Sequence, residues 1–180
     1  MRSFVATRRL LALAAGVALL AATAGCRRGP RPIAYGRDGC AYCLMQINDA
    51  RYAAELVTHV GKVYTFDSIE CLVSYYRILD AAHRDAVETM WVSDYSHPGT
   101  LISAASASYL RVTGPGSPMG RGMLAVARAA DLEPLLGRAS SGAMTWDDVL
   151  TLAGREQWDQ RAPGHADAAP MDMPEMTRVR

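Results

Sequence analysis

Residues 52–79 read YAAELVTHVGKVYTFDSIECLVSYYRIL, and their pattern changes from strand-like to helix-like within a few residues. Segments 52–58 and 63–66 are rich in β-branched and aromatic residues, and the residues between them include a glycine suited to a turn. This arrangement predicts a β-hairpin. The apolar residues that follow repeat at helical spacing and predict a helix with one buried face, made of Ile69, Leu72, Val73, Tyr76 and Leu79.

The start of this helix has its own signal. Asp67-Ser68-Ile69-Glu70 supplies an N-cap with an acid three residues on. Asp67 and Glu70 are thereby explained as helix-start residues and need no catalytic role. Cys71 lies about 200° around the helix from Ile69, off the apolar face, so we expect it to face another layer of the fold or solvent.

Further strands and helices are expected on both sides of this segment. Cys43, Met45 and Ile47 alternate with their neighbours as one face of a strand would. The later elements are predicted as strands over 90–92, 105–112 and 123–127, a short helix over 130–136, and a last helix that is capped at Thr145 and runs to about residue 153. The predicted fold class is α+β: two small α+β units, residues 40–98 and 99–160, with mixed or antiparallel sheets and short helices.

The N-terminal segment has the composition of a lipoprotein signal peptide. Three arginines precede an uncharged run from Leu10 to Ala24, and small residues lead into Cys26. The run is shorter than the roughly 20 residues that a comfortable membrane span needs. We therefore expect removal of residues 1–25, a lipid on Cys26, and a tether over 26–39 that holds the protein on the membrane, facing the periplasm. Plain secretion and an uncleaved anchor are the alternatives.

Charge and composition limit the partners. Loss of three arginines with the signal peptide changes the net charge from +1 to −2, which leaves no electrostatic footprint for nucleic acid. Segment 161–180 has no apolar period and is expected to be a disordered tail. Its methionines, Met171, Met173 and Met176, either catch Cu(I) weakly through their thioethers or have no function.

The stretch Cys40-Ala41-Tyr42-Cys43-Leu44-Met45 combines two thiols and a thioether in six residues. Soft sulfur ligands of this kind select soft metals, above all Cu(I), so Cys40, Cys43 and Met45 are candidate copper ligands. Both thiols can face one point only if the two residues between them form a turn. With Cys26 lipidated, three thiols remain, and three cannot all pair within one chain in an oxidising compartment.

Other candidate ligands lie further along the chain. Met119, in the turn-rich loop 113–120, either fills a gap in the core or brings a second thioether to the cysteine site. Cys71 is a less favoured ligand. His59 and His97 lie beside turns and are expected at the surface, although an imidazole is an ordinary partner for copper.

Two alternatives to copper stay open. Cys40 and Cys43 could form a disulfide, structural or redox-active, which would make the protein a thiol-disulfide lipoprotein. They could instead contribute to a zinc site, although no second paired motif supplies the remaining ligands. The sequence has no motif for hydrolysis, phosphate binding or group transfer, so we expect a protein that is not an enzyme.

Four segments, in order along the chain, resemble the NosL family of lipoproteins that deliver copper to nitrous oxide reductase. These segments are Cys40-x-x-Cys43-x-Met45-x-Ile47-x-Asp49, Phe66-Asp67-Ser68-Ile69-Glu70-Cys71, Val92-Ser93-Asp94-Tyr95 and Ser117-Pro118-Met119-Gly120. The likeness covers the chain from Cys40 to Ala153. Leu44 and Gly39 depart from the family pattern, which often has a glycine and an acid at these positions.

The resemblance implies two ββαβ-type units and a distant likeness to the organomercurial lyase fold. It implies Cu(I) binding by cysteine and methionine sulfur, with Cys43 and Met119 as the first ligands, followed by Cys40 and Met45. The lipid anchor would keep such a carrier at the membrane, where we expect a copper exporter or an assembly complex to load it. The expected client is nitrous oxide reductase or another copper enzyme.

Overall fold

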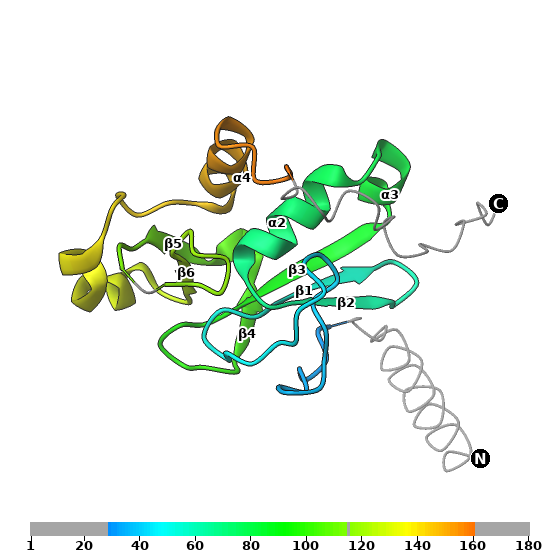
Figure 1. Cartoon of the computed structure of the whole chain (residues 1–180), viewed down its shortest axis with the longest axis horizontal. Coiled ribbons are helices and arrows are strands. Elements are labelled where there is room, and N and C mark those ends of the chain that lie inside the picture. The colour runs from blue at the N-terminus through cyan, green and yellow to red at the C-terminus, as the bar shows by residue number, and fades with distance from the viewer. Residues whose placement is uncertain (1–28, 115, 161–180) are drawn as a thin grey trace, which may run out of the picture.

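The computed structural model describes residues 29–114 and 116–160 and contains two antiparallel sheets (Figure 1). The larger sheet has the strand order β2-β1-β3-β4, and the smaller sheet pairs β5 with β6. The strands are β1 (Ala54–Thr58), β2 (Val63–Phe66), β3 (Val87–Ser93), β4 (Leu101–Ser103), β5 (Ser108–Arg111) and β6 (Met123–Val126). The helices are α2 (Ile69–Ile78), α3 (Ala81–Asp85) and α4 (Trp146–Arg155), with the 3-10 helices η1 (Ala104–Ser106) and η2 (Ala129–Arg138). The fold is therefore α+β with short helices, as predicted.

The hairpin predicted from residues 52–66 is confirmed as β1 and β2. Ala54 pairs with Phe66 and Val57 with Val63, so β1 begins two residues later than the sequence pattern indicated. Gly61 has a φ of 81° in the turn, a conformation that glycine adopts without steric cost.

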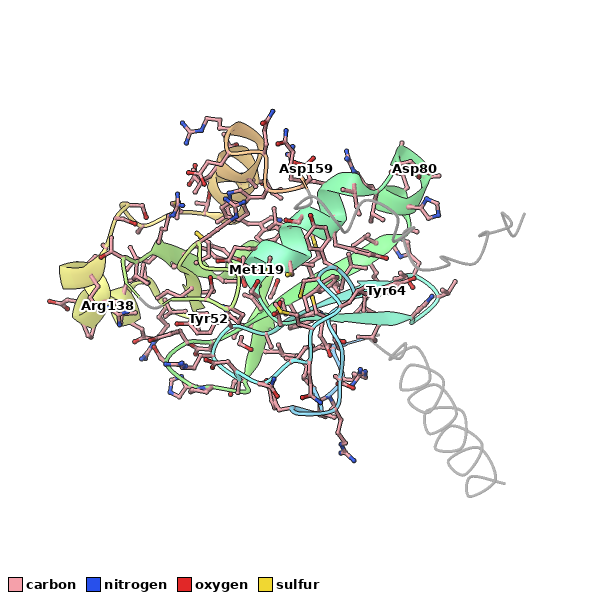
Figure 2. All side chains as sticks on the ribbon, viewed as in Figure 1. Tyr52, Tyr64, Asp80, Met119, Arg138 and Asp159 are labelled. Atoms are coloured by element: carbon pink, nitrogen blue, oxygen red, sulfur yellow. The ribbon has the colours of Figure 1, made fainter. Side chains whose placement is uncertain are left out.

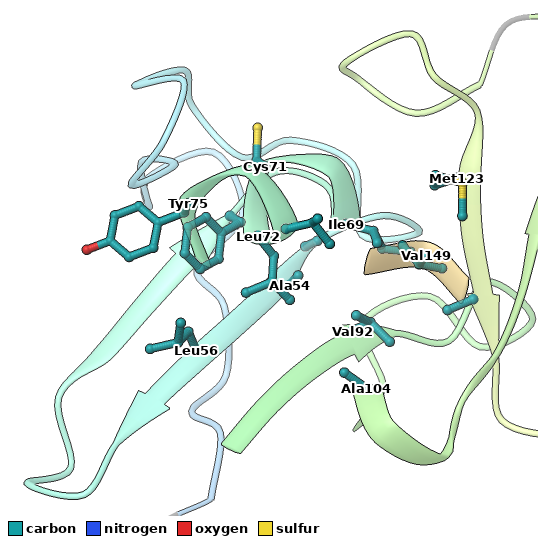
Figure 3. Packing of buried hydrophobic residues seen from close by; sticks show 14 of the residues in the cluster. Ala54, Leu56, Ile69, Cys71, Leu72, Tyr75, Val92, Ala104, Met123 and Val149 are labelled. Atoms are coloured by element: carbon teal, nitrogen blue, oxygen red, sulfur yellow. The ribbon is translucent and has the colours of Figure 1, made fainter. Parts of the chain in front are cut away.

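Helix α2 lies across one face of the larger sheet and also contacts α4 and β6 (Figure 1). Its predicted apolar face is present, since Ile69 and Leu72 pack on the sheet side (Figure 3). However, residues 69–75 are all buried. The helix is buried on more than one side because the larger sheet, α4 and β6 all contact it, and the thiols of Cys40 and Cys43 lie beside Cys71.

The predicted start of α2 needs a correction. The N-cap is Ser68, whose hydroxyl accepts a hydrogen bond from the Cys71 amide at 3.2 Å. Glu70 is therefore not the acid of a capping box. Its carboxylate is buried and accepts hydrogen bonds from the loop before β6.

The two halves of the chain share one core. β4 pairs with β3 in the larger sheet, so Leu101–Ser103 extends the sheet of the preceding residues. Tyr95 donates its amide to Ala125 at 2.8 Å, which ties the end of β3 to β6. One hydrophobic cluster includes residues of α2, both sheets and α4, and a smaller one lies between β5, β6 and η2.

Two element predictions were wrong in part, and the helix predicted over 130–136 is present as a 3-10 helix. Residues 43–47 form an irregular loop, in which only Gln46 makes an isolated bridge, to Gly39. The first residues of the predicted strand 105–112 belong to η1. The segment 129–138 is a 3-10 helix that contains Pro134, which lacks the amide that an α-helical hydrogen bond requires. The last helix is confirmed, with a capping box between Thr145 and Asp148.

Among the described residues no helix is long and apolar enough to cross a membrane. The predicted signal peptide, the lipidated Cys26 and the tail 161–180 lie outside the described residues.

Candidate metal centre

The Cys40–Met45 segment folds into a tight loop against the larger sheet. Cys40 donates its amide to the Met45 carbonyl at 2.8 Å, and Leu44 donates to the Cys40 carbonyl at 3.0 Å. Ala41 donates to Thr65 of β2 at 2.8 Å, which fixes the loop beside the start of α2. Leu44 adopts a φ of 64°, which non-glycine residues rarely do. The predicted turn between the two cysteines is confirmed, and it allows both thiols to face α2.

Cys71 meets these thiols from the first turn of α2. Figure 3 shows its sulfur on the opposite side of the helix from Leu72, which points to the sheet. This is the off-face position predicted from the helical period. The neighbouring layer is the Cys40–Met45 loop and not solvent, because Cys71 is fully buried.

These two elements bring four possible ligands together. The Sγ atoms of Cys40, Cys43 and Cys71 and a carboxylate oxygen of Asp67 all lie within 4.8 Å of one another. We call these four residues the cysteine cluster. Its three cysteines are free thiols; Cys40, Asp67 and Cys71 are buried, whereas Cys43 is partly exposed. The cluster therefore has one open side, at Cys43.

The thiols change each other's acidity. Hydrogen bonds from Cys43 and Cys71 lower the pKa of Cys40, because they stabilise its thiolate. The pKa values of Cys43 and Cys71 are raised, chiefly because each thiol donates to Cys40. Of the three thiols, Cys40 is therefore the one whose surroundings favour the thiolate.

Asp67 is the cluster member that sequence reasoning missed. Burial, followed by repulsion from the Cys40 thiolate, raises its pKa to about 6. Its Oδ1 atom is buried and has no hydrogen-bond partner within the described ranges. Such an orphaned oxygen beside three thiols suits a bound cation, whereas the sequence explained Asp67 as a helix-start residue. The signal available was its place in Phe66-Asp67-Ser68-Ile69-Glu70-Cys71, four residues before a cysteine.

The two predicted methionine ligands lie in different environments. Met45 is 47% exposed and lies on the outer side of its loop. Met119 is partly buried and packs against the same hydrophobic cluster as Cys43. Figure 2 shows Met119 over the N-terminal end of α2.

The loop that carries Met119 is fixed to α2 by a buried hydrogen bond. The Ser117 hydroxyl donates to Oε1 of Glu70, which also accepts from the Met123 amide at 3.2 Å. Ser117 and Glu70 are both buried. Glu70 directly precedes Cys71, and Ser117 lies two residues before Met119, so this bond fixes the Met119 loop to the turn of α2 that carries Cys71.

The histidines lie elsewhere. His59 is exposed beside the β1–β2 turn, as predicted. His97 contacts Asp94 at 2.9 Å and is also exposed. Across the described parts of the chain, the cysteine cluster is the one group of at least three cysteine, histidine or acidic residues that could hold a metal ion.

Comparison with known proteins supports the assignment of a family. The NosL family model matches residues 34–153, two thirds of the chain. The chain belongs to the NosL family. The crystal structure of the copper chaperone NosL from Shewanella denitrificans is similar in fold, with a TM-score of 0.56 and 21% sequence identity over 67% of this chain and 95% of that chain. No curated protein matches the chain.

Proposed function

We propose that this NosL-family protein is an extracytoplasmic Cu(I) chaperone. The observation that carries the proposal is the cysteine cluster, in which three free thiols converge at a partly open site. Thiolate and thioether ligands favour Cu(I), whereas carboxylate and water favour harder ions. Membership of a family that includes a copper chaperone supports the same conclusion.

The arrangement suggests how copper is held. Cys40 is the thiol whose pKa is lowered, so it binds Cu(I) most readily as a thiolate, and Cys43 loses its proton when Cu(I) binds to it. In our proposal Cys40, Cys43 and Met119 bind Cu(I), with Cys71 as the buried thiol behind them. Met45, exposed on the Cys43 loop, takes part while copper enters and leaves.

The same arrangement supports transfer and not turnover. Copper passes from Cys43, at the open side, to ligands of the client by stepwise exchange, and no bond of a substrate is broken. We propose nitrous oxide reductase or another copper enzyme as the client, and a copper exporter or assembly complex as the source. Lipidation at Cys26 would keep the carrier on the membrane, facing the periplasm.

The thiol-disulfide alternative has less support. A reactive C-x-x-C cysteine is an exposed thiol of low pKa, commonly at a helix N-terminus. Here the more exposed cysteine is Cys43, whose pKa is raised, and the motif lies in a loop. Cys40, the cysteine whose pKa is lowered, is buried.

A competitive titration tests the proposal. The reduced protein is titrated against a chromogenic Cu(I) chelator, and a parallel series uses a Zn(II) probe. We expect one Cu(I) per chain and retention of Cu(I) against the chelator. Failure to compete for Cu(I), with tight binding of Zn(II), would contradict a copper-carrier function.

A further inference from the structure

Trp158, just after α4, contacts both elements of the cysteine cluster. Its carbonyl accepts a hydrogen bond from Ser74 of α2 at 2.9 Å and one from the Tyr42 hydroxyl at 3.5 Å. Tyr42 lies between Cys40 and Cys43 in the chain. The Trp158 side chain is buried, and its indole N–H donates to Glu156 at 3.0 Å. The segment after α4 therefore packs against both elements that carry the cluster.

Two arginines connect the Met119 loop to Trp158 and Glu156. The Arg121 guanidinium lies 5.3 Å from the centre of the Trp158 ring, and its nitrogen is 3.7 Å from Glu156. Arg111 of β5 contacts the other oxygen of Glu156 at 2.6 Å and donates to the Arg121 carbonyl at 2.9 Å. Arg121 is thus held through both its side chain and its backbone.

The backbone segments at the two ends of the Met119 loop lie unusually close to their neighbours. A Cβ atom on Gly122 would lie 2.2 Å from the Val112 carbonyl oxygen, and one on Gly116 would lie 2.7 Å from the Gly122 Cα. Gly122 also has a φ of 75°. Only glycine fits such close backbone contacts, so the residues between these glycines form the tip of the loop.

Met119 is the middle residue of this tip, between two different anchors. Ser117, on one side, is held by Glu70 in a buried hydrogen bond. Arg121, on the other side, is held by partly exposed contacts, in which its side chain and that of Glu156 are about one third exposed. Exposed ion pairs are weak and screened by salt, whereas the buried bond is shielded from water.

We propose that Arg111, Arg121, Glu156 and Trp158 form a latch that holds Met119 on the cysteine cluster and sets the rate of Cu(I) exchange. The inference rests on the proposed function and adds to it a mechanism that controls how fast Cu(I) is released. When the latch opens, the tip swings about the Ser117–Glu70 anchor and withdraws the thioether, so that a client ligand can take its place. The latch residues position Met119 and do not touch the metal.

A double-mutant cycle tests the latch. Cu(I)-loaded protein is mixed with excess chelator, and the release rate is followed by stopped-flow absorbance for the wild type, Arg121→Gln, Met119→Leu and the double variant. Arg121→Gln removes the charge and the cation–π contact, so we expect release about 3- to 10-fold faster than in the wild type. In the Met119→Leu background the same change should have no further effect, because no thioether remains to be positioned.

Two further variants serve as controls. Arg128→Gln breaks an exposed pair with Asp131 outside the latch and should leave the release rate unchanged. Arg121→Lys keeps the charge and can lie over the indole ring, so it should restore most of the wild-type rate. Thermal unfolding of each variant checks that the fold is retained.

The possible failures are distinguishable. Equal acceleration by Arg121→Gln in both backgrounds would assign Arg121 a general structural role and overturn the latch. An unchanged rate in Arg121→Gln, with weaker binding after Cys43→Ser, would also overturn it but leave the proposed function intact. Copper retention that is insensitive to Cys43→Ser would contradict the proposed function itself.

Discussion

The cysteine cluster and Glu55 are two buried ionisable regions that differ in what surrounds the charge. In the cluster, the Cys40 thiolate is stabilised by two neighbouring thiols. Glu55, in the middle strand pair of the larger sheet, is fully buried and accepts one hydrogen bond, from the Arg31 amide at 3.0 Å. Its other oxygen has no partner among the residues described. Burial accordingly raises the pKa of Glu55 to about 7.

This difference in surroundings makes the cysteine cluster a candidate binding site, whereas Glu55 only lowers the stability of the fold. A charge surrounded by exchangeable thiol protons can exchange them for a metal ion, whereas a charge beside a single backbone amide has nothing to exchange. Buried groups with altered pKa values are therefore informative about function when other ligands surround them, and less so when they stand alone. The four predictions that follow test this contrast.

The largest effect is expected from the thiols. Cys43→Ser removes a ligand and should lower the affinity for Cu(I) by more than about 100-fold, whereas Cys71→Ser removes a thiol behind the ligands and should lower it by about 10- to 100-fold. Chelator competition measures the change. Met90→Leu removes a partly buried sulfur of β3 outside the cluster and should have no effect. Equal affinities in all three variants would show that copper binds elsewhere.

Asp67→Asn should separate zinc from copper. Carboxylate oxygen is an ordinary zinc ligand but a poor ligand for a soft cuprous ion. We expect Zn(II) affinity to fall about 10- to 100-fold, while Cu(I) affinity changes much less. Parallel titrations with a zinc probe and a Cu(I) chelator measure both. A larger loss for Cu(I) than for Zn(II) would argue against sulfur as the source of selectivity.

Glu55→Gln should stabilise the protein at high pH. The folded state raises the pKa of Glu55 from 4.5 to about 7, so between these values the folded protein binds more protons than the unfolded chain. The Glu55 contribution to stability is therefore most favourable below pH 4.5 and is lost as pH rises to about 7.

This shift corresponds to about 3 kcal/mol, and we expect a gain of about 1–2 kcal/mol for the glutamine variant at pH 8, because the buried glutamine amide also gives up hydrogen bonds to water. Urea unfolding between pH 5 and pH 8 measures the difference between the two proteins. A difference that stays constant with pH would contradict the raised pKa.

The smallest effect is expected from Tyr42→Phe. The hydroxyl of Tyr42 contacts the Trp158 carbonyl at 3.5 Å, which is long for a hydrogen bond. Its removal should cost less than about 0.5 kcal/mol of folding free energy, as measured by urea unfolding. A cost several times larger would mean that this contact is a principal link between the Cys40–Met45 loop and the segment after α4.

Local sequence signals predicted the elements well and the site in part. The β1–β2 hairpin, β3, β6 and the capped helix α4 follow from residue periodicity and caps within each segment. The loop over 43–47 was missed because its alternation is that of a strand, while the positive φ of Leu44 and the bonds to Cys40 bend it back on itself. Tertiary contacts overrode the local pattern there.

The position of Asp67 could not be predicted for a related reason. A helix-start aspartate is locally sufficient as a cap, and only the folded chain shows that Ser68 performs the capping while Asp67 meets the thiols. Glu70 was likewise explained locally, although its partners are Ser117 and Met123, about 50 residues away. The spacing of residues within one segment does not show which distant residues a buried acid will contact.

X-ray absorption at the copper K edge of the Cu(I)-loaded protein tests the central claim most directly. The account predicts a three-coordinate shell made of sulfur, which loses one sulfur in Met119→Leu and is disrupted in Cys43→Ser. A shell dominated by nitrogen or oxygen, or one that neither substitution alters, would contradict it.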